Sequence, residues 1–238
     1  MAYCYFKEKP KTSDYLRTVL HFIPVLIFTA GIIILVYAGW PIISYELALA
    51  PKFQESKVIK PYFTFPQNEN LLSFGVVGAG QGDLTEIQNW FPENWQNTNI
   101  SRTRYYNLSI PSLGIFNAIV SVGGENLSEG LVHYGGTAYP GSFGNAVIFG
   151  HSVLPQFFNP HDYMTIFSTL PTLKIGDEII VDFDSVRYCY QVEEMIEVEP
   201  EDLSILEQRF DDSYLTLVTC VPPGTYLRRL VVRARLVK

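Results

Sequence analysis

Charged and apolar residues are distributed unevenly along this chain, and the first long apolar stretch predicts a membrane anchor. No charged residue occurs between Arg17 and Glu46. A spanning helix needs about 20 mostly apolar residues, so the stretch is long enough to cross a bilayer. It also exceeds the apolar core of a cleaved signal peptide, and no small-x-small cleavage site follows it. We therefore predict an uncleaved transmembrane anchor at residues 18–45, with Trp40 and Tyr45 as interfacial aromatic residues.

Basic residues on one side of this stretch predict its orientation. Lys7, Lys9, Lys11 and Arg17 all precede it. Positive charge is enriched on the cytoplasmic side of membrane helices. We expect residues 1–17 in the cytoplasm and everything beyond the anchor outside, in a single-pass protein of the cell membrane.

The next region, residues 46–103, has little periodicity and is rich in Pro, Asn and Gln. We interpret it as an extracytoplasmic stalk with one short helix near residues 84–90. Its segment GVVGAGQGDL is rich in glycine, but no βαβ pattern surrounds it, so a dinucleotide-binding loop is not indicated.

From residue 104 to the end, short runs of β-forming residues alternate with turn residues. Helical patterns occur only at residues 163–170 and 201–208. Eight short strands with few helices are typical of a closed β-barrel or a β-sandwich. The expected strands are residues 105–110, 115–121, 131–134, 146–149, 178–182, 186–198, 214–219 and 230–237.

Composition narrows the function classes. The net charge of −7 argues against a nucleic-acid partner bound through a basic surface. Three cysteines, Cys4, Cys189 and Cys220, are too few for a disulfide framework. A bridge between Cys189 and Cys220 is conceivable, but the surroundings of Cys220 favour a working thiol. No cofactor or metal site is predicted.

Cys220 ends an apolar run and precedes a Pro-Pro-Gly turn and two arginines. Side chains alternate between the faces of a strand, so Cys220 shares a face with Thr216 and Val218. The same alternation on the last strand selects Arg229, rather than Arg228, to meet an outward-pointing Cys220. A nearby cation lowers the pKa of a thiol, and a guanidinium can also stabilise an oxyanion.

A histidine would complete such a site by carrying the proton of the leaving amine. Of the four histidines, His21 falls in the predicted anchor, His133 on a short strand and His161 in a loop. His151 ends the strand AVIFG and begins a loop, an edge where catalytic residues often occur. The alternative is that all four are ordinary and Cys220 is only a buried apolar residue.

Four segments, in order, resemble the sortase family. TLVTC at residues 216–220 is similar to the TLxTC signature, and Arg229 stands nine residues after the cysteine. GTAYPGSFGNAVIFGHS, residues 136–152, resembles the segment that leads into the sortase histidine. IPSLGIFNAIV, residues 110–120, resembles the opening strands of the sortase barrel.

The resemblance implies a mainly β fold, an eight-stranded sortase-type barrel at residues 104–238. It implies a cysteine transpeptidase with His151, Cys220 and Arg229 as catalytic residues. Such enzymes cleave an LPxTG-like sorting motif of a secreted protein through a thioester, then transfer the acyl group to an amine on the cell wall or a pilin subunit. A membrane-anchored cysteine peptidase that hydrolyses the thioester is the alternative.

The resemblance leaves the sortase subclass open. The turn VPPGTYLRR resembles the short turn of the pilin and related classes. Those classes often carry a lid and a second, C-terminal membrane segment, and this sequence ends at Lys238 with no such segment. Residues 89–95, NWFPENW, are a candidate lid. The acidic loop EVEPEDLSILEQRFDD is interpreted as solvated rather than calcium-binding.

Overall fold

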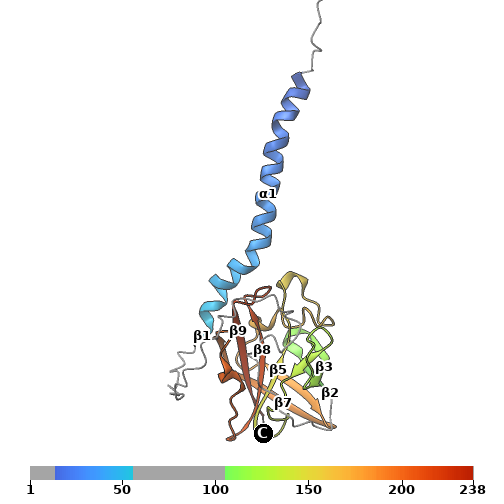
Figure 1. Cartoon of the computed structure of the whole chain (residues 1–238), viewed down its shortest axis with the longest axis vertical. Coiled ribbons are helices and arrows are strands. Elements are labelled where there is room, and N and C mark those ends of the chain that lie inside the picture. Colours follow the sequence, from blue (N-terminus) through green and yellow to red (C-terminus); the bar gives the residue numbers. More distant parts are fainter. Residues whose placement is uncertain (1–13, 56–104, 238) are drawn as a thin grey trace, which may run out of the picture. The chain divides into compact units, whose positions relative to one another are not determined.

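The computed structural model describes residues 14–55 and 105–237, and the chain divides between Ile43 and Ser44 into two compact units (Figure 1). The first unit holds most of helix α1 (Asp14–Ala48). This helix is long and apolar enough to span a membrane, and its most apolar window buries none of its residues within the protein. Pro24 and Pro41 both lie inside it.

The second unit contains a closed barrel of eight strands. Neighbouring strands around the barrel follow the order β7-β6-β2-β3-β4-β5-β8-β9, and pairing of β7 with β9 closes it. A short strand, β1, adds to β7 in parallel at Ile196 and Glu197. The pairs β3–β4 and β5–β8 are also parallel. The strands are β1 (Gln54–Glu55), β2 (Tyr105–Ile110), β3 (Ile115–Val122), β4 (Leu131–His133), β5 (Gly144–Phe149), β6 (Glu178–Phe183), β7 (Val186–Val198), β8 (Ser213–Val221) and β9 (Arg228–Leu236).

Both faces of β5 and β8 are buried, which explains their nearly continuous apolar sequence. Alternate residues such as Ile148 and Leu217 belong to the larger core cluster. Their neighbours Phe149 and Val218 belong to a second cluster that also contains Cys220. Each fully buried Leu, Ile or Phe contributes about 1.5–3 kcal/mol to folding.

The second cluster is covered by irregular segments. Leu127 comes from the loop between β3 and β4, and Ile205 comes from the 3-10 helix η6 (Leu203–Leu206). The outward face that carries Cys220 is therefore packed rather than solvated, contrary to the outward-pointing thiol that strand alternation suggested.

The predicted fold class is confirmed: a mainly β, eight-stranded barrel follows an N-terminal apolar helix. The helix expected at residues 163–170 is wrong, because that segment is a series of turns that ends in the 3-10 helix η5 (Leu170–Thr172). The Thr165 hydroxyl donates to the Asn159 carbonyl, and Pro171 disfavours helical backbone at the residue before it. The helix expected at residues 201–208 is only the single turn η6.

Two expectations lie outside the described residues, namely the stalk helix at 84–90 and the candidate lid at 89–95. Tyr45 differs from its expected interfacial role. It is 2% exposed, and its ring stacks on Phe53 at a centroid distance of 6.4 Å within the barrel unit.

Candidate active site

Strand register brings Cys220 and Arg229 together. Cys220 is directly opposite Arg229 in the antiparallel β8–β9 pair, and Arg228 is opposite Val221. Nη1 of Arg229 donates to the Cys220 sulfur at 3.4 Å and to the Tyr226 carbonyl at 3.2 Å. The guanidinium is thus held against the sulfur by the turn that follows β8.

The residues on either side of His151 are both hydrogen-bonded to the end of β8. The Gly150 amide donates to the Val218 carbonyl at 3.1 Å, and the Gly150 carbonyl accepts from the Thr219 hydroxyl at 2.9 Å. The Ser152 hydroxyl donates to the Cys220 carbonyl at 2.8 Å. His151 therefore leaves β5 beside the cysteine, as the parallel β5–β8 pairing requires.

No room exists for a larger residue before this histidine. A Cβ added at Gly150 would lie 2.2 Å from the Phe167 ring and 2.8 Å from Leu131. The Phe167 amide also donates to the His151 carbonyl at 3.1 Å. Close packing on one side and strand bonds on the other fix the backbone at His151.

Burial dominates the electrostatics of the thiol. Cys220 is 3% exposed, and desolvation raises its pKa to about 11, although the charge of Arg229 acts in the opposite direction. The sequence led us to expect a thiol with a lowered pKa. The charge of Arg229 lowers the pKa of the thiol as expected, but removal of water from the sulfur raises this pKa by more. At neutral pH the resting thiol keeps its proton and needs a base to become a nucleophile.

Comparison with known proteins identifies the family of this chain. The model of the Sortase domain matches residues 108–237, more than half of the 238-residue chain. The chain belongs to the sortase family. Sortase D of Bacillus subtilis is 23% identical over 203 residues, which cover 84% of this chain and 88% of that protein.

Solved sortase structures share the fold. Sortase C-1 from Actinomyces oris superposes with a TM-score of 0.51 and 28% identity, over 58% of this chain and 76% of that one. A lid mutant of sortase A from Corynebacterium diphtheriae gives 0.50 and 30%, over 59% and 73% of the two chains. In general terms, this sortase is a cysteine transpeptidase, and its apolar N-terminal helix suggests a single membrane anchor.

In this sortase, the loop that follows His151 contacts the turn that follows Cys220. A Cβ at Gly224, in the turn between β8 and β9, would lie 3.0 Å from the Leu154 side chain and 3.2 Å from its backbone nitrogen. Leu154 belongs to the loop that follows His151. In contrast, Tyr226 and Leu227 of the same turn are half exposed or more.

The other histidines occupy different environments. His133 is buried on β4, with Nδ1 2.8 Å from the Tyr106 hydroxyl and Nε2 3.0 Å from the Thr137 hydroxyl. His161 is exposed in a loop, and His21 lies in α1. Among the three histidines of the described barrel, His151 is the one that its neighbours place beside Cys220.

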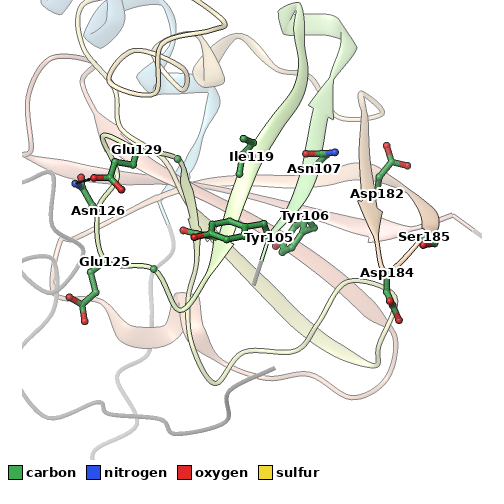
Figure 2. Close-up of a pocket in the computed structure, with 13 residues that line it drawn as sticks. Tyr105, Tyr106, Asn107, Ile119, Glu125, Asn126, Glu129, Asp182, Asp184 and Ser185 are labelled. Carbon is green, nitrogen blue, oxygen red and sulfur yellow. Dashed lines mark hydrogen bonds between the residues drawn. The ribbon is translucent and has the colours of Figure 1, made fainter. Parts of the chain in front are cut away.

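A cavity of about 940 Å³ lies elsewhere on the barrel, near strands β2 and β3 (Figure 2). Glu125 and Glu129 lie on one side of it, and Asp182 and Asp184 lie on the other. The candidate catalytic residues are not among those that line this cavity. It is therefore separate from the candidate active site.

Sequence reasoning missed the residues that position the histidine. Ser152 directly follows His151, and Thr219 directly precedes Cys220. A hydroxyl beside each reactive residue was the available signal. Their partners are backbone carbonyls on another strand, which cannot be identified without the β5–β8 register.

Proposed function

We propose that this chain is a sortase that cleaves an LPxTG-like sorting motif through a thioester on Cys220 and transfers the acyl fragment to an amine. The observation that carries the proposal is the meeting of three strand ends. The guanidinium of Arg229 lies 3.4 Å from the Cys220 sulfur, and hydrogen bonds on both sides of His151 hold it next to the same strand.

The first half-reaction forms the thioester. His151 takes the thiol proton as the Cys220 sulfur attacks the carbonyl carbon of the threonine-like residue. Arg229 and nearby backbone N–H groups stabilise the oxyanion, a contribution of about 3–4 kcal/mol in comparable sites. The C–N bond then breaks, and His151 returns the proton to the departing amine.

The second half-reaction reverses these roles. An incoming amine attacks the thioester carbonyl, and neutral His151 removes its proton. The C–S bond breaks and releases the sulfur, which recovers a proton at the end of the cycle. In the alternative, a peptidase, water takes the place of the amine.

The partners follow from this chemistry. The donor is a secreted protein with a C-terminal sorting signal, and the acceptor is an amine on a cell-wall precursor or a pilin subunit. We propose residues 18–45 as the anchor segment, of which Ser44 and Tyr45 already belong to the barrel unit. We propose residues 46–103 as the stalk and 104–238 as the catalytic barrel, outside the membrane, with a cytoplasmic N-terminus. Retention at the membrane concentrates the enzyme beside exported substrates.

The test uses the fragment that begins at Ser44, where the compact barrel unit begins. It is incubated with a sorting-motif peptide, with and without an excess of oligoglycine or a lysine peptide. We expect an amide-linked product with the amine and slow cleavage without it. Rapid hydrolysis that several chemically different amines leave unchanged would assign the chain to the peptidases instead.

A further inference from the structure

A buried polar network joins the last turn of α1 to strands β7 and β9. The Tyr45 hydroxyl donates a hydrogen bond to Oε1 of Glu197. The second oxygen of that carboxylate lies 3.1 Å from Nη1 of Arg228, and Nη2 of Arg228 donates to Oε1 of Glu46. We call these four residues the carboxylate network. All of them belong to the compact unit that begins at Ser44.

The network has the character of a buried site rather than a surface ion pair. The Glu197 side chain is 6% exposed, whereas those of Arg228 and Glu46 are 29% and 44% exposed. A buried carboxylate is costly unless hydrogen bonds and a positive charge compensate it. Tyr45 and Arg228 supply these, one to each oxygen, so removal of either partner weakens the compensation of this buried carboxylate.

The network ends at the arginine of the candidate active site. Arg228 directly precedes Arg229 on β9, and Val198, which follows Glu197 on β7, is the pairing partner of Arg229. The same Nη1 of Arg229 that donates to the Cys220 sulfur also donates to the Arg228 carbonyl at 3.4 Å. A shift of the Arg228 backbone therefore changes the position of the guanidinium relative to the sulfur.

We propose that the carboxylate network makes the end of α1 a positioning element of the active site. Tyr45 and Glu46 hold Arg228, and Arg228 holds the backbone and hydrogen bond that place Arg229 against Cys220. Misplacement of a reacting group by about 1 Å can cost on the order of 100-fold in rate, so this support matters. Tyr45, Glu46, Glu197 and Arg228 are thus positioning residues, and the inference rests on the proposed roles of Cys220 and Arg229.

The experiment measures alkylation of Cys220 by iodoacetamide across pH, in the full chain in detergent micelles. Peptide mapping separates Cys220 from Cys189 and Cys4. Tyr45→Phe removes only the hydroxyl that donates to Glu197. We expect the alkylation midpoint to move to higher pH and the rate at pH 8 to fall on the order of 3- to 30-fold, the range for residues that act through a contact network.

A matched control is Tyr214→Phe. Its hydroxyl also donates to a carboxylate, Oδ2 of Asp211 at 2.9 Å, but it lies near the start of β8, at the opposite end from Cys220. We expect no change in the alkylation profile of this variant. Glu197→Gln is the second test variant, because it keeps the shape of the side chain and loses the charge, and it should act like Tyr45→Phe.

A double-mutant cycle with Arg229→Ala shows whether the network acts by positioning Arg229 or by a general destabilisation of the barrel. If the network acts through Arg229, adding Tyr45→Phe to Arg229→Ala has no further effect on the alkylation midpoint. An unchanged midpoint in Tyr45→Phe and Glu197→Gln, or effects that add to those of Arg229→Ala, would overturn the proposal. If Arg229→Ala alone leaves the midpoint unchanged, the proposed role of Arg229 fails instead, so the two failures are distinguishable.

Turnover provides the second measurement. With a sorting-motif peptide, Tyr45→Phe should lower kcat by on the order of 3- to 30-fold and leave KM nearly unchanged, because the proposed role of the network is to place Arg229 rather than to bind the peptide. A rise in KM at constant kcat would contradict a positioning role.

Discussion

Between pH 7.5 and pH 5, acid should destabilise this barrel through His133. The imidazole is 1% exposed, and burial lowers its pKa to about 4 from the usual 6.5. A hydrogen bond with Thr137 raises the pKa, but burial outweighs it. The Thr137 hydroxyl already donates to the Tyr134 carbonyl at 2.8 Å, so it accepts from Nε2–H, and Tyr106 donates to Nδ1. A charged ring would present a second N–H to the Tyr106 hydroxyl.

The sign and size of the effect follow from linkage. A histidine with a lowered pKa binds more protons when unfolded, so its contribution to stability is present above pH 6.5 and is lost as pH falls toward 4. With these two pKa values, the loss between pH 7.5 and pH 5 is about 2 kcal/mol. This is a large share of the stability of a small domain.

The assay is urea unfolding of the fragment that begins at Ser44, followed by intrinsic fluorescence at several pH values between 5 and 7.5. His133→Gln should be less stable at pH 7.5 but should lose most of the pH dependence in this window. The exposed His161 provides the control, since His161→Gln should keep the wild-type slope. Parallel profiles for the wild type and His133→Gln would refute the reasoning.

Three further predictions concern the site and the membrane. Arg229→Ala should lower kcat/KM by about 100- to 1000-fold, more than Arg228→Ala, and equal losses in the same peptide assay would contradict the strand register as the basis of the site. Gly150→Ala should displace His151, because its Cβ would lie 2.2 Å from the Phe167 ring; we expect at least a tenfold loss of kcat, and unchanged kinetics would show that the loop absorbs the methyl group. An impermeant thiol reagent should leave Cys4 unlabelled in intact cells, whereas labelling of Cys4 would reverse the proposed orientation.

Local patterns were sufficient to predict the barrel strands. Short runs of β-forming residues bounded by turn residues identified all eight within a few residues, including the 13-residue β7. Prediction failed at residues 163–170, where a helical spacing of apolar residues was not a helix. There, Ile166 and Phe167 are buried one after the other in the core, and side-chain hydrogen bonds to the backbone replace the helical ones.

Strand alternation was sufficient to predict one part of the candidate site, the pairing of Cys220 with an arginine. Alternation selected Arg229 over Arg228 as the partner of Cys220, and the register places these two residues opposite each other. Burial of Cys220 was not predictable, because the core cluster to which it belongs includes residues from loops distant in sequence, such as Leu127 and Ile205. The contact of Tyr45 with Glu197 was also missed, since it joins residues 152 positions apart.

The central claim is that Cys220 carries the acyl group, and intact-protein mass spectrometry tests it most directly. The Ser44 fragment is mixed with a sorting-motif peptide, and the reaction is quenched in acid before the amine is added. We predict an increase in mass equal to the peptide fragment that ends at the threonine, released by hydroxylamine and absent in Cys220→Ala. Cleavage of the peptide by the wild type without any adduct, or an adduct that persists in Cys220→Ala, would contradict it.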